Sequence, residues 1–338
     1  MCQLYFAKKM PYKNKIEKFS FECAVCEGKS FLKIYGVSVF NVCLCERCGL
    51  VCLNPRMDER GYMETFYQNY RRDLFGSYLA EPVSQDELQK RAMESPFPRK
   101  VLDDLKPYLL KESKILEVGS GAGEALIFLK ENGFSNVVGV EPVLEDCQRL
   151  EKLYGIECHA QSFSEFASTN DKNGKFDCVI LKHVIEHFVE PGRALQAING
   201  LMAGKGILYI MTPDLYRFKN PFSQFCIPHT FYFSPATLEA LLLKYGFKLK
   251  GYRKNLIPHE MVLLAEKSSS VPEIHYDPGE PEKVLAHLRK NKFRFIFFKS
   301  VRFAEAAFMK VFGEYAYLKT RMFLKNLVVA VIKRLKQK

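Results

Sequence analysis

Between residues 113 and 268, short apolar segments alternate with segments whose apolar residues recur at helical spacing. The short apolar segments predict strands at residues 114–118, 136–140, 156–160, 176–181, 206–211, 247–252 and 261–265. The segments between them predict helices at residues 125–132, 144–154, 194–202 and 235–245. This alternation predicts an α/β fold built on a doubly wound parallel sheet.

The same pattern divides the chain into four parts. Residues 1–55 contain paired cysteines, and residues 56–112 form a helical linker region interrupted by prolines. Residues 113–268 carry the strand–helix alternation. Residues 269–338 form a polar link followed by a basic amphipathic helical tail.

Most of the positive charge lies in this tail. The whole chain has a formal net charge of +12, and residues 283–338 contain 15 Lys or Arg against two acids, a net +13. The other 282 residues therefore sum to about −1, which argues against a nucleic-acid groove across the body. A basic amphipathic helix is typical of segments that bind an anionic membrane surface. Packing against the body or a second subunit is the first alternative, and RNA binding is the second.

Composition and targeting signals favour a cytoplasmic protein. Hydrophobic residues make up 48% and charged residues 26% of the chain, as in ordinary globular proteins. No segment reaches the roughly 18 apolar residues of a membrane-spanning helix, and residues 1–15 lack the apolar core of a secretory signal. In a reducing compartment, the eleven cysteines predict metal ligands where they cluster and small core residues elsewhere, not a disulfide framework.

A glycine-rich turn follows the first predicted strand of the alternation. It reads E-V-G-S-G-A-G from Glu117 to Gly123, with Gly119 and Gly121 between them. Glycine is needed where the backbone turns sharply and where a ligand approaches the main chain closely. The spacing differs from the G-x-G-x-x-G of dinucleotide-binding turns. A second acid, Glu141, ends the next strand, where its carboxylate could accept hydrogen bonds from both hydroxyls of a ribose.

These residues resemble the first motif, E/D-x-G-x-G-x-G, of the class I S-adenosylmethionine-dependent methyltransferases. Residues 176–188, which include Lys182, are similar to the fourth-strand segment of that family. Gln161 and Ser162, just after the third predicted strand, fall where the family binds adenine. The resemblance implies a Rossmann-like, seven-stranded methyltransferase sheet that binds S-adenosylmethionine.

The fourth-strand segment ends in Glu186 and His187. Ligands of such sheets bind beyond the carboxyl ends of the strands, so both residues lie near the expected cofactor crevice. We expect them to cap and orient the next helix, with direct catalysis as the alternative.

Two cysteine pairs lie near the N-terminus. Cys23-A-V-Cys26 and Cys45-E-R-Cys48 are separated by 18 residues, and Gly49 follows the second pair. Two C-x2-C pairs at such a separation are typical of a four-thiolate zinc site, whose closed shell stabilises a small lobe and does no chemistry. Four unrelated buried cysteines are the alternative.

The residues after the cysteine pairs narrow the resemblance. Residues 48–56 read C-G-L-V-C-L-N-P-R, and Phe66, Tyr67 and Tyr70 follow. This stretch is similar to methyltransferases of bacterial surface-polysaccharide and deoxysugar pathways, which carry an N-terminal zinc lobe. The resemblance covers about residues 21–268, and it implies a structural Zn²⁺ and a sugar acceptor.

The segment after the fifth predicted strand carries the candidate acceptor chemistry. Residues 229–234, H-T-F-Y-F-S, are similar to a segment of the zinc-lobed sugar methyltransferases, and the resemblance implies catalytic roles for His229 and Tyr232. In the carbon-methylating members an acid directly precedes the histidine and a tyrosine precedes it by three residues, whereas Pro228 and Cys226 stand there in this chain. Methylation of a hydroxyl is therefore favoured, with His229 either as general base or as a residue that positions the loop.

Together these features predict a cytoplasmic methyltransferase that uses S-adenosylmethionine to methylate a hydroxyl of a sugar nucleotide or glycan intermediate. The tail would attach it peripherally to the inner face of an anionic membrane. One alternative is a methyltransferase that acts on RNA or another macromolecule. The other is a non-enzymatic zinc and membrane scaffold.

Overall fold

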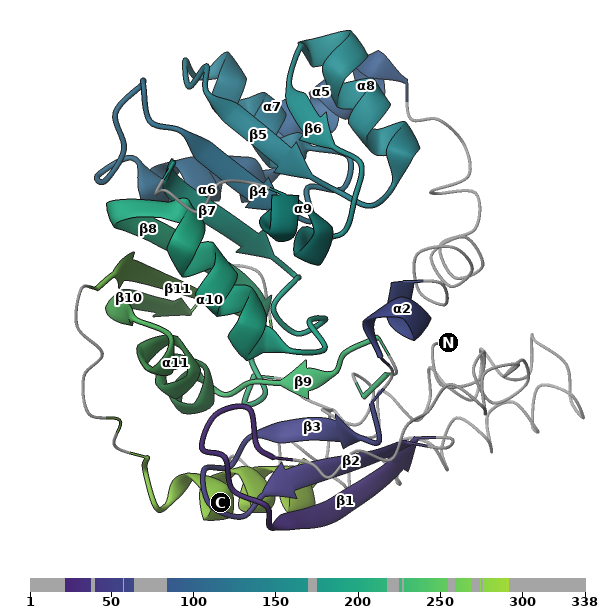
Figure 1. Ribbon diagram of the computed structural model, residues 1–338, viewed down its shortest axis with the longest axis vertical. Coiled ribbons are helices and arrows are strands. Elements are labelled where there is room, and N and C mark those ends of the chain that lie inside the picture. The colour runs from purple at the N-terminus through teal and green to yellow at the C-terminus, as the bar shows by residue number, and fades with distance from the viewer. Residues whose placement is uncertain are drawn as a thin grey trace, which may run out of the picture. The chain divides into compact units, whose positions relative to one another are not determined.

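Two β-sheets organise the part of the chain that the computed structural model describes (Figure 1). The described residues are 22–37, 40–56, 58–63, 84–169, 175–217, 225–226, 228–254, 259–268, 274 and 276–291. The chain divides into two units, residues 1–218 with 225–285 and residues 219–224 with 286–338. Both sheets belong to the first unit. Phe66, Tyr67, Tyr70 and most of the basic tail lie outside the described residues.

The larger sheet has seven strands in the order β10-β11-β8-β7-β4-β5-β6. Along the chain they are β4 (Ile115–Val118), β5 (Val137–Val140), β6 (Glu157–His159), β7 (Phe176–Lys182), β8 (Met202–Pro213), β10 (Phe247–Lys254) and β11 (Glu260–Lys267). The strands from β4 to β8 pair in parallel. β11 runs antiparallel to β8 and β10, because β10 and β11 follow one another too closely for a helical crossover. The predicted doubly wound sheet of seven strands is therefore confirmed, with one reversed strand.

Helices cover both faces of this sheet (Figure 1). One face packs against α5 (Gln85–Glu94), α6 (Pro96–Leu105), α7 (Glu124–Glu131) and α8 (Leu144–Tyr154). The other packs against α9 (Phe163–Thr169), α10 (Pro191–Leu201) and α11 (Pro235–Lys244). Successive side chains of a strand point to opposite faces, so in β4 Ile115 joins the first layer, and Leu116 and Val118 join the second.

The smaller sheet connects the cysteine-containing lobe to the segment around residue 229. Its antiparallel strands are, in order, β1 (Phe31–Val37), β2 (Phe40–Cys45), β3 (Val51–Asn54) and β9 (Phe231–Tyr232). The backbone N–H of Leu53 also donates to the carbonyl of Thr230 at 2.9 Å. A short helix, α2 (Glu59–Tyr62), follows β3. The lobe therefore holds the candidate acceptor segment through main-chain hydrogen bonds.

Two further features concern cysteines and membranes. Cys147 in α8 and Cys158 in β6 form a disulfide, which the sequence analysis did not anticipate. The pair arises because α8 packs over β6 and brings the two Cα atoms to 4.9 Å. None of the helices in the described ranges is long and apolar enough to cross a membrane.

Candidate active site

The glycine-rich turn connects β4 to α7 through left-handed backbone positions. Gly119, Gly121 and Gly123 have φ angles of +69°, +56° and +84°, which other residues rarely adopt. Space is also limiting, because a Cβ on Gly119 would lie 2.5 Å from Val184 Cγ2. A Cβ on Gly123 would lie 2.3 Å from Leu150 Cδ2. Glycine is therefore required by both conformation and packing.

Two buried acids flank this turn. Glu141, 2% exposed, accepts hydrogen bonds from the backbone N–H groups of Gly121 at 2.9 Å and Val143 at 3.2 Å. Glu117 is equally buried, and its Oε2 has no hydrogen-bond partner among the residues described. Burial raises the pKa of Glu117 to about 8. An unpartnered buried carboxyl oxygen marks a position where the donor group of a ligand would fit.

A pocket of about 340 Å³ opens beside the turn, which is within the usual size of small-molecule sites. At the carboxyl ends of the parallel strands its lining comprises Val118, Gly119, Val140, Pro142, Ser162 and Phe163. Tyr62 of α2 and His187, after β7, line it as well. This is the end of the sheet at which doubly wound folds bind ligands, and its glycine, apolar and hydroxyl groups fit an adenosine-containing cofactor.

The other predicted cofactor residues are not among the lining residues of the pocket. The backbone N–H of Gln161 donates to the carbonyl of His159 at 3.0 Å. The ammonium of Lys182 lies 3.7 Å from the centre of the Phe97 ring, on the face covered by α6. Of the predicted set, Gly119 and Ser162 are thus the residues that reach the pocket wall.

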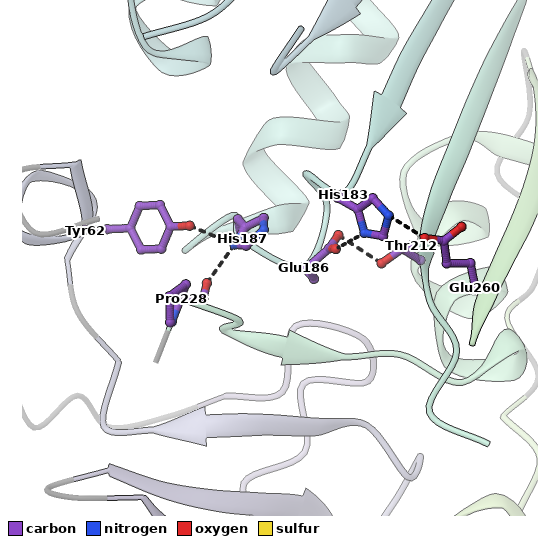
Figure 2. Close-up of polar contacts among 7 residues, drawn as sticks. All are labelled: Tyr62, His183, Glu186, His187, Thr212, Pro228 and Glu260. Atoms are coloured by element: carbon purple, nitrogen blue, oxygen red, sulfur yellow. Dashed lines mark hydrogen bonds and ion pairs between the residues drawn. The ribbon is translucent and has the colours of Figure 1, made fainter. Parts of the chain in front are cut away.

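Figure 2 shows a network of imidazole and carboxylate groups beyond the carboxyl ends of β7 and β8. His183 Nδ1 lies 3.2 Å from Glu186 Oε1, and its Nε2 lies 2.8 Å from Glu260 Oε1. The hydroxyl of Thr212 donates to Glu186 Oε2 at 2.9 Å. Burial alone would lower the pKa of His183, but the two carboxylates outweigh burial and raise it to about 9. His183 is therefore an imidazolium at neutral pH.

His187 lies between Tyr62 and Glu186 in Figure 2, and it lines the pocket. Its Nδ1 lies 2.9 Å from the carbonyl oxygen of Pro228 and 2.8 Å from Tyr62 Oη. A carbonyl oxygen can only accept, so we assign the proton of the neutral ring to Nδ1 and the lone pair to Nε2. Burial lowers the pKa of His187, so the ring is neutral at pH 7 and can accept a proton.

His229, a predicted catalytic residue, packs directly against His187. The two rings meet edge to face, with their centres 4.9 Å apart. Burial, followed by the neighbouring His187, lowers the pKa of His229 to about 3. One ligand atom each from Glu186, His187 and His229 lies within 4.8 Å of the others. The structure therefore brings the predicted residue together with two residues for which the sequence favoured a structural role.

Tyr232, the other predicted catalytic residue, is buried, and its ring centre lies 6.0 Å from that of His229. Its hydroxyl donates to the carbonyl of Cys226 at 2.9 Å and accepts from the N–H of Cys226 at 3.0 Å. These bonds close the loop that carries His229. The catalytic role of Tyr232 stays a prediction.

The four cysteines of the predicted zinc site converge in the N-terminal lobe. Cys23 Sγ lies 3.5 Å from Cys48 Sγ. Cys26 Sγ lies 3.5 Å from Cys45 Sγ. All four sulfurs lie within 4.8 Å of one another. A Cβ on Gly28 would lie 3.2 Å from Cys26 Sγ and 3.6 Å from Cys45 Sγ, so the turn passes close to the sulfurs. Four converging thiols are a donor set that suits Zn²⁺.

Sequence reasoning missed four members of the imidazole–carboxylate network, and one of them, His183, lies within the fourth-strand segment. Tyr62, Thr212 and Glu260 come from α2, β8 and β11. No motif marks them, since each belongs to a different segment and only the fold brings them together. The available signal was that His183 and Thr212 lie at the carboxyl ends of predicted strands, because ligands gather at that edge.

Comparison with known proteins gives one match to a family model and several similar solved structures. Residues 89–250 match the family model of a methyltransferase domain. A similar solved structure is an S-adenosylmethionine-dependent methyltransferase from Methanosarcina mazei, with 16% identity over 49% of this chain and 98% of that chain and a TM-score of 0.43. A second, from Archaeoglobus fulgidus, has 18% identity over 54% and 100%, with a TM-score of 0.42.

A third similar structure is magnesium protoporphyrin IX methyltransferase from Synechocystis with bound S-adenosylmethionine. It has 18% identity over 62% of this chain and 95% of that chain, with a TM-score of 0.42. No curated protein matches the chain. The residues that match the family model contain the glycine-rich turn, Glu141, and the imidazoles of His183, His187 and His229.

Proposed function

We propose that this enzyme, which carries an S-adenosylmethionine-dependent methyltransferase domain, methylates a hydroxyl of a sugar nucleotide or glycan intermediate. The observation that carries the proposal is that one pocket is lined both by the glycine-rich turn and by Tyr62 and His187. Methyl transfer needs such a shared pocket, because the acceptor oxygen and the methyl carbon must align at about 3–3.5 Å before reaction.

The cofactor side of the pocket is formed at the ends of β4, β5 and β6. S-adenosylmethionine, when bound, supplies a methyl group that its sulfonium already activates. Gly119 and Ser162 would contact the adenosine, and the Glu141 carboxylate would accept hydrogen bonds from the ribose hydroxyls. The unpartnered oxygen of Glu117 suits an amino group as donor. The chain itself then has to align the acceptor and remove a proton.

The acceptor side supplies a base and polar groups. His187 and His229 form a neutral imidazole pair, since burial lowers both pKa values, and His187 lines the pocket. A hydroxyl acceptor needs such a base, because its proton must leave as the new bond forms. Glu59 and Ser164 also line the pocket, and they could bind other hydroxyls of a sugar.

We further propose that the four-thiol cluster binds Zn²⁺ as a structural ion. Tetrahedral zinc with bonds of about 2.3 Å to sulfur keeps its sulfurs about 3.8 Å apart, close to the 3.5 Å between the paired sulfurs. The lobe also carries β3, whose pairing with β9 fixes Phe231 and Tyr232 beside the loop of His229. Zinc would thus support the active site through the lobe without taking part in the reaction.

Calorimetry of the full chain tests the cofactor half of the proposal. Glu141→Ala should weaken binding of S-adenosylmethionine about 10- to 30-fold, because two hydrogen bonds of about 1 kcal/mol each would be lost. Glu157→Ala, at an exposed acid on the neighbouring strand β6, is the matched control and should bind like wild type. Equal affinity in wild type and Glu141→Ala would remove Glu141 from the site.

Mass spectrometry of glycans from cells with and without the gene tests the acceptor half. We expect one glycan or sugar nucleotide to lose a mass of one methyl group when the gene is deleted. An unchanged glycan profile together with a lost methyl group on RNA would replace the sugar acceptor with a macromolecule.

We also propose that the basic tail attaches the enzyme to an anionic membrane surface. The support is the net charge of +13 in residues 283–338, because each Lys or Arg near such a surface contributes about 1 kcal/mol. The full chain should sediment with anionic vesicles, more weakly in high salt, and a chain ending at residue 270 should stay in solution. Equal binding of both chains, or no binding of the full chain, would contradict the proposal.

A further inference from the structure

Three charged side chains lie in a row at the end of β7 (Figure 2). His183 stands between Glu186 and Glu260, at nitrogen–oxygen distances of 3.2 Å and 2.8 Å. A carboxylate oxygen only accepts, so both ring nitrogens donate and the ring is positively charged. His183 also has a φ of +52°, which non-glycine residues adopt where surrounding contacts require it. The fold therefore holds the cation in place between the two carboxylates.

Glu186 is fixed through both its side chain and its main chain. Its carboxylate is 1% exposed and accepts hydrogen bonds from His183 and Thr212. Its carbonyl accepts from the backbone N–H groups of Thr230 at 2.8 Å and Phe231 at 3.2 Å. These two N–H groups directly follow His229 in the chain. Glu186 therefore holds its own carboxylate in place and, through its main-chain carbonyl, also the loop that carries His229.

The row presents a net negative charge to the imidazole pair. Two carboxylates and one imidazolium sum to −1, and ligand atoms of Glu186, His187 and His229 lie within 4.8 Å of one another. Burial would raise the pKa of Glu186, but the hydrogen bond from His183 and the nearby charges of His187, His183 and His229 together outweigh burial and lower the pKa to about 2. Among the described residues, the phenols of Tyr62, next to His187, and Tyr232, near His229, also face the pair.

We propose that Glu186 and His183 are positioning residues for the transfer proposed above, on which this inference rests. Glu186 stabilises the imidazolium that forms on the His187–His229 pair as the acceptor is deprotonated. In that step the hydroxyl proton passes to an imidazole nitrogen and the hydroxyl oxygen bonds to the methyl carbon. The electron pair of the broken methyl–sulfur bond stays on sulfur.

The new positive charge is favoured because it appears within 4.8 Å of the Glu186 carboxylate. Glu260 supplies the second negative charge. Without it, the positive charge of His183 would cancel that of Glu186 and leave no net negative charge near the imidazoles. His183 in turn keeps Glu186 ionised and oriented inside the protein, where an unpaired carboxylate would take up a proton.

NMR titration of the histidine-labelled full chain, which has seven histidines, tests this electrostatic coupling. In Glu186→Gln, loss of the negative charge should keep His187 and His229 unprotonated at every pH at which the protein stays folded. In His183→Gln, the amide can still donate a hydrogen bond to Glu186 and keep it ionised, as Thr212 does. Loss of the positive charge should then move the titration of both imidazoles to higher pH by about one unit. The two variants should therefore shift the same imidazoles in opposite directions.

Glu157→Gln is the matched control. Glu157 pairs with His159 at 3.0 Å on the surface of β6, so this variant removes an imidazole–carboxylate contact away from the pocket. It should leave the titration of His187 and His229 unchanged. Calorimetry with S-adenosylmethionine checks that each variant still folds and binds.

A purely structural role predicts a different result, because loosening the loop would expose both imidazoles in either variant. Their titration would then approach the ordinary value of about 6.5. That outcome in Glu186→Gln overturns the proposal, as does an unchanged titration in both variants. If Glu186→Gln does not fold, Glu260→Gln can replace it in the experiment. Removing this more distant negative charge should also lower the pH at which His187 and His229 become protonated.

The titration needs no acceptor, so a failure of the proposed electrostatic coupling can be distinguished from a failure of the proposed function. If the imidazole titrations shift as expected but the protein methylates no glycan, the electrostatic coupling is supported and the proposed sugar acceptor is wrong. Once an acceptor is in hand, Glu186→Gln should lower kcat on the order of 10²-fold and change KM only a few-fold.

Discussion

Among its described residues, the first unit contains two clusters of ligating side chains, each with its ligand atoms within 4.8 Å of one another. The thiol cluster consists of four cysteines from two turns between residues 23 and 48. The imidazole–carboxylate cluster consists of Glu186, His187 and His229, which lie on two loops far apart in the chain. The two clusters differ in charge balance, and that difference distinguishes the metal site that we propose from the proton-transfer site that we propose.

The thiol cluster gathers ligands that bind metal as anions, so a cation would complete it. The imidazole–carboxylate cluster already has its cation, since His183 donates to Glu186 and Glu260. The Nδ1 atom of His187 likewise faces the carbonyl of Pro228. Converging ligand atoms alone therefore do not identify a metal site. The partners of those atoms decide whether the cluster needs an ion or exchanges a proton.

The largest expected effect concerns metal content. Purified protein should contain one zinc per chain, and Cys45→Ser should lose it and unfold the lobe, because structural zinc contributes about 10 kcal/mol or more to the folding of such sites. Elemental analysis and thermal unfolding measure this. Cys43→Ser is the control, since this buried cysteine lies on β2 outside the cluster, and it should keep its zinc.

A second zinc ion per chain would contradict the distinction between the thiol cluster and the imidazole–carboxylate cluster. If it persisted in Cys45→Ser and disappeared in His229→Ala, the imidazole–carboxylate cluster would be a metal site after all. A fully folded protein without metal would instead remove the ion from the lobe.

The next effect concerns catalysis. His187→Ala should lower kcat by about 10²- to 10⁴-fold, the usual contribution of a general base, while zinc content stays unchanged. Affinity for S-adenosylmethionine should change only a few-fold, because His187 lies on the acceptor side of the pocket. His159→Ala, which changes a partly exposed imidazole on β6, is the control. Full activity in His187→Ala would shift the base to another residue.

The two clusters also show how much of the structure the sequence could predict. Strand and helix positions followed from apolar periodicity, and α8 begins and ends where the pattern placed it, at residues 144 and 154. The thiol cluster followed from spacing because its ligands are close in the chain. β11 departed from the parallel pattern because its direction depends on the connection to β10.

The imidazole–carboxylate cluster depends on tertiary structure, which spacing does not encode. Glu260 reaches His183 because β11 pairs with β8, and Tyr62 reaches His187 because α2 follows the strand β3 of the small sheet. Glu186 and His187 stood in a motif, but their expected helix-capping role is not what the structure shows. α10 begins at Pro191 with Glu190 as its N-cap. Their partners became visible only once the fold was known.

The smallest expected effect is the pH dependence of stability through His183. Its pKa is raised to about 9 in the folded protein, against about 6.5 when unfolded. A raised pKa means that the folded state binds the proton more tightly, so this stabilisation is complete below pH 6.5 and disappears as the pH rises to 9. Thermal unfolding should therefore show a melting temperature that falls across this range.

Glu117 complicates the wild-type curve, because burial raises its pKa to about 8. A carboxyl with a raised folded pKa loses stability as the pH rises from its ordinary value to the folded one, so it contributes in the same direction up to pH 8. The comparison of wild type with His183→Gln isolates the imidazole, because Glu117 is present in both. We expect the difference in melting temperature to shrink between pH 6.5 and 9. A constant difference would mean that His183 stays in one charge state over this range, and the imidazolium at the centre of the network would have to be abandoned.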